Sequence, residues 1–507
     1  MKMTASTESL YFLIYQAPHF PITQLPSDIL VEIFRSIESR NTLSTLSLCS
    51  KRLHQYTQPY LYSHFIQLGD TCTSLSYFLL TILRKPSLAQ YTKTFTANAL
   101  LGYCTNIDMS MFTPTDWKLL RESLEKVHIL ETGKRDPYFG QHISEQWFSF
   151  IEQGNWDALV AYILCLLPNL ESLNIVNHAS GCPYGYPYLE TVLNRAANLQ
   201  FKSKHLNTPP YPYSFPRLKH LHLAKHDQIH YPRMGFEILR LIPFLNLPSI
   251  RTVSGHMISD YHFPSSLTLS SSIPPNQQPL DHHPASLTNS FTLSTFYAPP
   301  LPNFTFHTTH LTLSHTVLQS STLYPFFSYF KTLKYLAWEW SYDIRNAEKE
   351  NLSYHLDMTS FIHSLSHLKE HLEVLKFRVL TPPVIQKDDW VSNLSSFRKL
   401  KVLDISACLV YGGYGGMRED VPTCLSLSEG KKSLDLLDGE REGEGEGGIV
   451  KFFTNLPDGL EKLIWRDCND GILKDARRFL PDSNRDDDRE RIPRSLKVLE
   501  CISETEK

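Results

Sequence analysis

Apolar and polar positions follow a helical period soon after residue 20. Pro26 suits the first turn of a helix, where its missing N–H would have no partner, and Ser27 and Asp28 favour the positive end of the helix dipole. The apolar residues of the helix predicted here fall on one stripe: Ile29, Leu30, Ile33, Phe34 and Ile37. This helix therefore has one face for packing and another for solvent.

A second amphipathic helix is predicted after a short polar turn. Asn41 or Thr42 suits its N-cap. Its apolar stripe consists of Leu43, Leu46, Cys49, Leu53 and Tyr56. Two such helices, together about 35 residues long, bury too little surface to be stable alone. Their apolar faces must therefore pack on the rest of the chain or on another protein.

From about residue 157 a short pattern recurs, in which apolar residues stand at the first, fourth and sixth places. The matches are Leu170-x-x-Leu173-x-Ile175, Leu218-x-x-Leu221-x-Leu223, Ile250-x-x-Val253, Leu311-x-Leu313, Leu333-x-x-Leu336-x-Trp338, Leu372-x-x-Leu375-x-Phe377, Leu400-x-x-Leu403-x-Ile405, Leu460-x-x-Leu463-x-Trp465 and Leu496-x-x-Leu499-x-Cys501. Alternating side chains of a short strand face inward while a helix returns the chain, so stacked units share one core.

This pattern resembles a leucine-rich repeat and predicts an α/β fold, an irregular leucine-rich-repeat solenoid of horseshoe shape. Two matches extend to Cys408 and Cys468, at the position where that family carries a residue that satisfies backbone groups in the turn. A different α/β domain is the alternative, because the spacing between matches is less regular than the roughly 20 to 29 residues of regular repeats.

The first predicted helix begins LPSDILVEIF, and NTLSTLSLCSKRL follows after the turn. Together they resemble an F-box, whose pattern is roughly LPxEILxxIFxxL, a polar turn, then LxxLxxVSRxW. The chain departs from that pattern at Asp28, where Glu is commoner, and at Leu53, where Trp is frequent. Residues 59–62 and 83–95 are also similar to the segments that follow the F-box in many fungal members.

The resemblance implies that the apolar face of this unit binds the Skp adaptor of a cullin–RING ubiquitin ligase. The residues that it assigns to adaptor binding are Leu25, Pro26, Ile29, Leu30, Ile33, Phe34, Leu43, Leu46, Cys49 and Leu53. The Leu53 departure is expected to weaken that contact. The alternative without any partner is a helical hairpin that caps the next domain.

Composition divides the chain further. Pro and Ser dominate one insertion near residues 260–303, and Gly and Glu another near 412–448, so both are expected to be disordered loops. The expected organisation is an N-terminal tail at 1–19, the F-box at 20–66, a helical linker and solenoid cap at 67–156, and the irregular repeat domain at 157–507.

Charge and cysteine content limit the possible partners and the compartment. With 49 Lys and Arg against 52 Asp and Glu, the net charge of −3 provides no global field for nucleic acid or anionic lipid. Nine cysteines without a CxxC motif predict reduced thiols in the cytoplasm or nucleus. The apolar run at 158–167 is about half the length that spans a bilayer, and that at 10–17 lacks a signal-peptide cleavage site.

The motif search predicts no catalytic centre, no cofactor and no metal. His226 and His230 have the i, i+4 spacing of zinc ligands, but no Cys or Glu completes a ligand set. Cys182 lacks the neighbouring base that a nucleophile needs. Among the known signatures, GxSxG, HExxH and GxxxxGK[ST] are absent from the sequence. The Gly-rich run at 443–448 is not expected to cradle a phosphate, because its Glu residues would repel one.

These observations favour a substrate-recognition subunit: the F-box binds the Skp adaptor, and the repeat domain holds a protein target for ubiquitination. An F-box scaffold that acts outside a ubiquitin ligase is the alternative, and an unrecognised enzyme is a third. On the target side, Trp338, Trp340 and Trp465 are candidate contacts, because Trp often anchors interfaces. The alternative for these three residues is packing in the core.

Overall fold

The computed structural model describes residues 22–67, 73–99, 107–127, 143–177, 187–210, 213–225, 236–259, 305–316, 318, 320–341, 358–380, 393–407, 409, 452–466, 493 and 495–502. Outside these residues lie the predicted tail at 1–19, most of the insertions predicted near 260–303 and 412–448, and Cys182, His226, His230, Cys408 and Cys468. Within the described ranges no helix is both long and apolar enough to cross a membrane.

The N-terminal unit holds three α-helices where two were predicted. They are α2 (Ser27–Ser36), α3 (Arg40–Cys49) and α4 (Lys51–Leu61), preceded by the short η1 (Ile22–Gln24). The predicted second helix is broken at Ser50, which has an extended backbone and whose hydroxyl accepts a hydrogen bond from the Leu53 N–H at 3.1 Å. Ser39, and neither Asn41 nor Thr42, caps α3.

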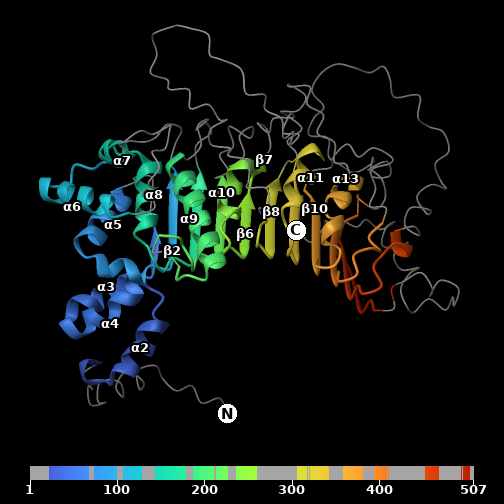
Figure 1. The fold of residues 1–507 in the computed structure, drawn as a ribbon. Coiled ribbons are helices and arrows are strands. Elements are labelled where there is room, and N and C mark those ends of the chain that lie inside the picture. Colours follow the sequence, from blue (N-terminus) through green and yellow to red (C-terminus); the bar gives the residue numbers. More distant parts are fainter. Residues whose placement is uncertain are drawn as a thin grey trace, which may run out of the picture.

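An 11-stranded sheet dominates the rest of the molecule (Figure 1), and all of its strands pair in parallel. Its strands, in both chain and spatial order, are β1 (His64–Ile66), β2 (Thr94–Ala99), β3 (Ser172–Asn177), β4 (His220–Lys225), β6 (Thr252–His256), β8 (His310–Thr316), β9 (Tyr335–Trp340), β10 (Val374–Val379), β11 (Val402–Ser406), β12 (Lys462–Arg466) and β13 (Val498–Ile502). The two-residue strands β5 (Phe236–Glu237) and β7 (Ile258–Ser259) form a separate pair.

The register of the sheet confirms the predicted repeat. Each of the nine sequence matches supplies one strand, from β3 to β13. The central apolar residues of all eleven strands lie side by side: Phe65, Phe95, Leu173, Leu221, Val253, Leu311, Leu336, Leu375, Leu403, Leu463 and Leu499. The chain therefore has an N-terminal helical unit followed by an α/β region with an all-parallel sheet, as in a leucine-rich-repeat solenoid.

The sheet begins earlier than predicted. Strand β1 lies in the range expected for the F-box, and β2 in the range expected for a helical linker. Both were overlooked because Phe65 and Phe95 occupy the place of leucine, and neither segment carries the full apolar pattern. The parallel sheet therefore begins at His64, before residue 157.

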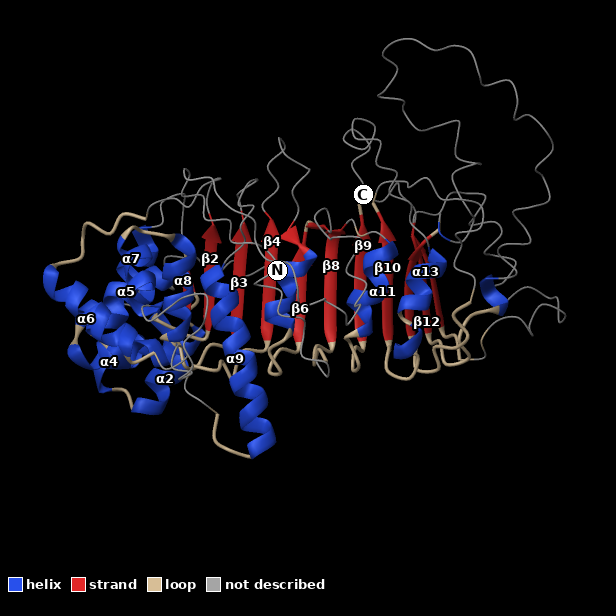
Figure 2. Cartoon of the chain, turned by 45° about the horizontal axis from the view of Figure 1, so that its top comes forward, coloured by secondary structure: helices blue, strands red, loops and turns tan. Residues whose placement is uncertain are grey.

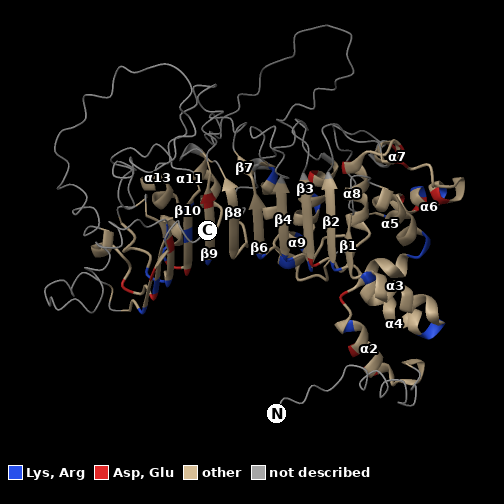
Figure 3. Cartoon of the chain, turned by 180° about the vertical axis from the view of Figure 1, so that it is seen from behind, with Lys and Arg blue, Asp and Glu red and all other residues tan. Residues whose placement is uncertain are grey.

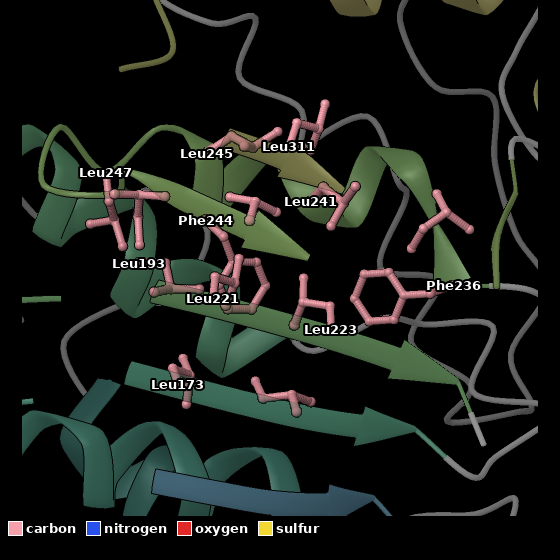
Figure 4. Packing of buried hydrophobic residues seen from close by; sticks show 14 of the residues in the cluster. Leu173, Leu193, Leu221, Leu223, Phe236, Leu241, Phe244, Leu245, Leu247 and Leu311 are labelled. Atoms are coloured by element: carbon pink, nitrogen blue, oxygen red, sulfur yellow. The ribbon is translucent and has the colours of Figure 1, made fainter. Parts of the chain in front are cut away.

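Helices return the chain along one face of the sheet (Figure 2). They are α5 (Thr73–Arg84), α6 (Pro114–Glu125), α7 (Ile143–Glu152), α8 (Trp156–Cys165), α9 (Pro187–Leu206), α10 (Ile242–Leu245), α11 (Ser320–Ser328) and α13 (Met358–Ser364), with 3-10 turns η2 (Pro86–Tyr91), η5 (Ile238–Leu241) and η7 (Ser366–Leu368). Strand residues such as Leu221 and Leu223 pack there with Phe244 of α10 (Figure 4). One continuous core results, as in stacked repeats.

The helical unit has a small core of its own, separate from the core of the sheet. The two are joined where α4 ends. The Ser63 carbonyl accepts hydrogen bonds from the Lys93 N–H at 2.8 Å and the Thr94 N–H at 3.1 Å. The buried Thr92 hydroxyl donates to the Tyr62 carbonyl at 3.0 Å. These backbone contacts hold the helical unit at the first edge of the solenoid.

Candidate adaptor-binding site

Helix α4 is the centre of the N-terminal unit, because both α2 and α3 pack on it. The fully buried apolar side chains of the unit are at most 3% exposed: Leu30, Phe34, Leu43 and Leu53. They come from all three helices. At roughly 1.5 to 3 kcal/mol for each buried side chain, this cluster supplies the main stabilisation of a very small unit.

Polar contacts fix α2 on α4. The Arg52 guanidinium donates to the carbonyls of Thr23 and Leu25, the latter at 2.8 Å. The hydroxyls of Ser27 and Tyr56 are 2.5 Å apart, and the Tyr60 hydroxyl donates to the carbonyl of Val31 at 3.2 Å. Hydrogen bonds from a charged donor are among the stronger ones in proteins. Arg52 therefore fixes the start of α2, where the predicted adaptor face begins.

Six of the ten residues predicted to contact an adaptor are accessible. Pro26, Ile29 and Cys49 are exposed, and 48% of the Ile29 surface is open. Leu25, Ile33 and Leu46 are half-buried and pack against the small core. Along α2, Ile29 and Ile33 are one helical turn apart and so share a face. The apolar surface that remains exposed on this face can be removed from water only if another molecule covers it.

The other four predicted contacts are buried within the unit. Leu30, Phe34, Leu43 and Leu53 lie inside the unit, so they shape the site without presenting a surface to a partner. The apolar stripe on each helix is wide enough to pack on α4 and to expose a second face. Packing on α4 buries most of the stripe. The departure at Leu53 therefore changes the internal packing and not the exposed contact face.

The sequence pattern missed Leu48, which is 84% exposed on α3. It lies beside Cys49 but off the Leu43 and Leu46 stripe, so its apolar character serves no packing inside the unit. The sequence did contain a signal for this residue: Leu48 is apolar but does not fall on the apolar stripe of its helix. Covering Leu48 and the open half of Ile29 contributes about 1 to 3 kcal/mol each, which suits an apolar protein contact.

The accessible surface of the site is largely apolar. Across the described part of the chain, no group of three or more His, Cys, Asp or Glu residues could hold a metal ion. The described residues of the N-terminal unit leave apolar side chains accessible at the start of α2, along α2 and on α3, and we call this set the open apolar face: Pro26, Ile29, Ile33, Leu48 and Cys49.

The three tryptophans considered for the target side are in the core. Trp338, Trp340 and Trp465 are at most 1% exposed. Trp338 packs against Phe361 of α13 at 4.6 Å between ring centroids, and Trp465 against Phe453 at 5.9 Å. They occupy inward positions of strands β9 and β12, where a large aromatic side chain fills the space between the sheet and its helices. Core packing, the alternative for these residues, therefore applies to all three.

Comparison with known protein families agrees with this geometry. Residues 22–58 match the model of the F-box domain, and this range covers η1, α2, α3 and most of α4. No curated protein matches the chain. F-box proteins are typically non-catalytic adaptors, and an F-box generally implies binding to a Skp-type adaptor. Residues 22–58 of this chain are an F-box domain.

Proposed function

We propose that this chain is the substrate-recognition subunit of a Skp–cullin–F-box type ubiquitin ligase. The observation that carries the proposal is the open apolar face, where Leu48 is 84% and Ile29 48% exposed. Exposed apolar residues that do not pack in the core add little to the stability of a small domain. Binding to a partner explains why they are exposed. A Skp-type adaptor is the partner that an F-box implies.

The repeat region is the proposed target-binding part. Its helix-free sheet face carries polar side chains at alternating strand positions, such as Asn174, whose amide donates to the Thr96 hydroxyl at 3.1 Å, and His222, which bonds to Ser254 at 3.1 Å. Extended solenoid surfaces of this kind suit protein binding. In the proposed function the chain holds a target near the ligase, and catalysis by proximity belongs to the partner subunits.

The test is capture of a purified Skp-type adaptor by the full chain, with purified cullin added to the mixture. We expect Ile29→Ser and Leu48→Ser, singly and together, to weaken capture while the thermal unfolding temperature is kept, because both side chains are open to solvent. Tyr77→Ser is the matched control, since Tyr77 is an aromatic residue 60% exposed on α5, outside the F-box.

Two results would decide against the proposal. Capture by the double variant as strong as by the natural chain would show that the open apolar face is not the contact. Capture of the adaptor without a cullin in the same complex would favour a scaffold that acts outside a ligase. Loss of capture in the double variant, with cullin present in the natural complex, supports the recognition subunit.

A further inference from the structure

A single row of residues precedes the strands of the long sheet, along the edge where the strands begin. Each carbonyl of this row, except that of its last member Lys497, accepts hydrogen bonds from the next repeat, as the Lys219 carbonyl does from the N–H groups of Arg251 and Thr252 at 2.9 and 3.0 Å. The members of this edge row are Lys93, Glu171, Lys219, Arg251, Thr309, Lys334, Glu373, Lys401, Glu461 and Lys497. Neighbours in the row are therefore about 4.8 Å apart, the distance between strands.

Most of the edge row is charge-compensated. Ion pairs join Lys93 to Glu171 at 3.6 Å, Lys334 to Glu373 at 3.2 Å, and Lys497 to Glu461 at 3.1 Å. Opposite charges at neighbouring strand positions stabilise a sheet, and like charges there destabilise it.

Lys219 and Arg251 break this pattern. They are direct neighbours of equal charge, both are exposed, and neither forms an ion pair with another described residue. Thr309, the next member of the row, is neutral. A like-charge pair in an otherwise compensated row destabilises the fold by repulsion and stabilises nothing in return. Such a local departure is typical of a binding surface.

Two further cations are held beside this pair. The buried Gln200 of α9 donates to the Phe215 carbonyl and to the Ser249 hydroxyl, both at 3.0 Å, and accepts from the Ser249 N–H at 2.9 Å. This amide ties the end of α9 to the segments that lead into β4 and β6. Lys204, one turn beyond Gln200, and Arg217, two residues beyond Phe215, are both exposed.

The four cations Lys204, Arg217, Lys219 and Arg251 are called the basic strip below. In Figure 3, which colours Lys and Arg blue, basic residues lie near the ends where β4 and β6 begin. Their field reaches a neighbouring imidazole. The pKa of His307 is lowered, first by burial and then by the positive charges of Lys204 and Arg251. Among the described residues of 199–222, 244–256 and 305–338 there is no Asp or Glu. Glu171, the row neighbour of Lys219, forms its ion pair with Lys93.

The ends of this region limit the kind of anion that fits. Along the edge row, acidic residues return at Glu171 on one side and Glu373 on the other. These are five strand spacings apart, or roughly 24 Å. A nucleic acid backbone or an anionic membrane surface would extend past both carboxylates, onto paired charges that offer it no net attraction. A short acidic stretch of protein, about seven extended residues, fits between them.

We propose that the basic strip docks an acidic segment, rich in Asp or Glu, of a protein partner. This inference deepens the proposed function and rests on it in one respect, that the partner is the ligase target. Arg251 is prepared for the contact, because its Nη1 donates to the carbonyls of Pro248 and Ile250 at 2.7 and 3.0 Å. Those bonds orient the guanidinium, and its remaining N–H groups suit a carboxylate.

The experiment measures direct binding to the full chain without any adaptor, by fluorescence anisotropy. The probe is a fluorescein-labelled peptide of about seven residues in which Glu alternates with Ser, long enough to cover the strip in an extended form. A peptide with Gln in place of Glu and a single-stranded oligonucleotide of similar length are the comparison probes. The test variant is Lys219→Gln/Arg251→Gln.

The matched control is Lys118→Gln/Lys497→Gln, which removes the same charge from two exposed sites that have carboxylate partners. We expect the Glu peptide to bind the natural chain and the control alike, more weakly as salt rises, and the test variant about tenfold more weakly. Equal binding of the Gln peptide, equal binding to the test variant, or preference for the oligonucleotide would each overturn the proposal.

This outcome is separate from adaptor capture. A chain that captures the Skp-type adaptor but does not bind the Glu peptide would retain the proposed function and lose the inference. A chain that binds the peptide through Lys219 and Arg251 but captures no adaptor would retain the acidic-partner surface and lose the ligase role. Thermal unfolding of both double variants establishes that each is folded, because all four positions are exposed.

Discussion

Ile29 and Leu30 are neighbours in α2 with opposite environments: Ile29 is 48% exposed and Leu30 is fully buried against α4. Truncation of the two side chains therefore has different consequences. Leu30→Ala is expected to destabilise the F-box by about 2 to 5 kcal/mol, because it leaves a cavity, whereas Ile29→Ala is expected to change its stability by less than about 1 kcal/mol.

Hydrogen exchange of the α2 and α3 amides would measure this difference, since the F-box core is separate from that of the sheet. Protection lost in Leu30→Ala, with the strands still protected, is the expected result. Equal loss in both variants would contradict the burial assigned to Ile29.

Arg52 positions the start of α2 through the Leu25 and Thr23 carbonyls. We expect Arg52→Met to weaken adaptor capture without touching the open apolar face, because two charge-assisted hydrogen bonds worth about 1 to 3 kcal/mol each are lost. Lys51→Met is the control, as the adjacent exposed residue of the same charge. Faster exchange of the first α2 amides in Arg52→Met, but not in Lys51→Met, would show that weaker capture comes from a displaced start of α2. Unchanged exchange in Arg52→Met would refute that explanation.

Asp404 on β11 is fully buried and accepts hydrogen bonds from Arg466 at 2.7 and 3.1 Å and from Arg378 at 3.1 Å. Asp404→Ala leaves both guanidinium groups without this carboxylate and is expected to destabilise the repeat region by about 3 kcal/mol. Glu500→Ala, which breaks the exposed 2.7 Å pair with Lys462, is expected to cost less than about 1 kcal/mol. Denaturant unfolding compares the loss of unfolding free energy in the two variants. Equally small losses would show that the buried carboxylate of Asp404 contributes no more than the exposed one of Glu500.

Asp116 couples stability to acid. Its pKa is lowered well below 3.8 by hydrogen bonds from Arg84 at 2.8 Å and from Thr113 at 2.6 Å. A carboxyl with a depressed folded pKa stabilises the fold above its unfolded pKa, and this contribution disappears as the pH falls through the folded value. Asp116→Asn is therefore expected to lower the unfolding temperature at pH 7, with a gap from the natural chain that narrows below about pH 4.

A pH series of thermal unfolding checks this prediction, with Asp28→Asn as control because Asp28 is an exposed residue in the first turn of α2. A gap that stays constant from pH 7 to pH 3 would mean that the Asp116 charge has no role, and that only the loss of its shape in the capping box matters.

Much of the fold followed from the sequence because the repeat is a local pattern. Apolar spacing placed all nine strands from β3 to β13, since alternation along a strand depends only on which side chains face the helices. The same reasoning missed β1 and β2, whose central residues are Phe65 and Phe95. Those strands are defined by pairing with the next repeat, which a pattern search within one segment does not detect.

The sequence by itself determined that residues 22–58 resemble an F-box and that their helices carry apolar stripes. Only the tertiary structure decided which part of each stripe is buried, because that depends on the position of α4: Leu30 and Phe34 lie beneath it, and Ile29 and Leu48 face solvent. In the same way, the sequence showed separate basic residues in a chain of net charge −3. Stacking of the strands placed Lys219 beside Arg251, because parallel register aligns residues that are distant along the chain.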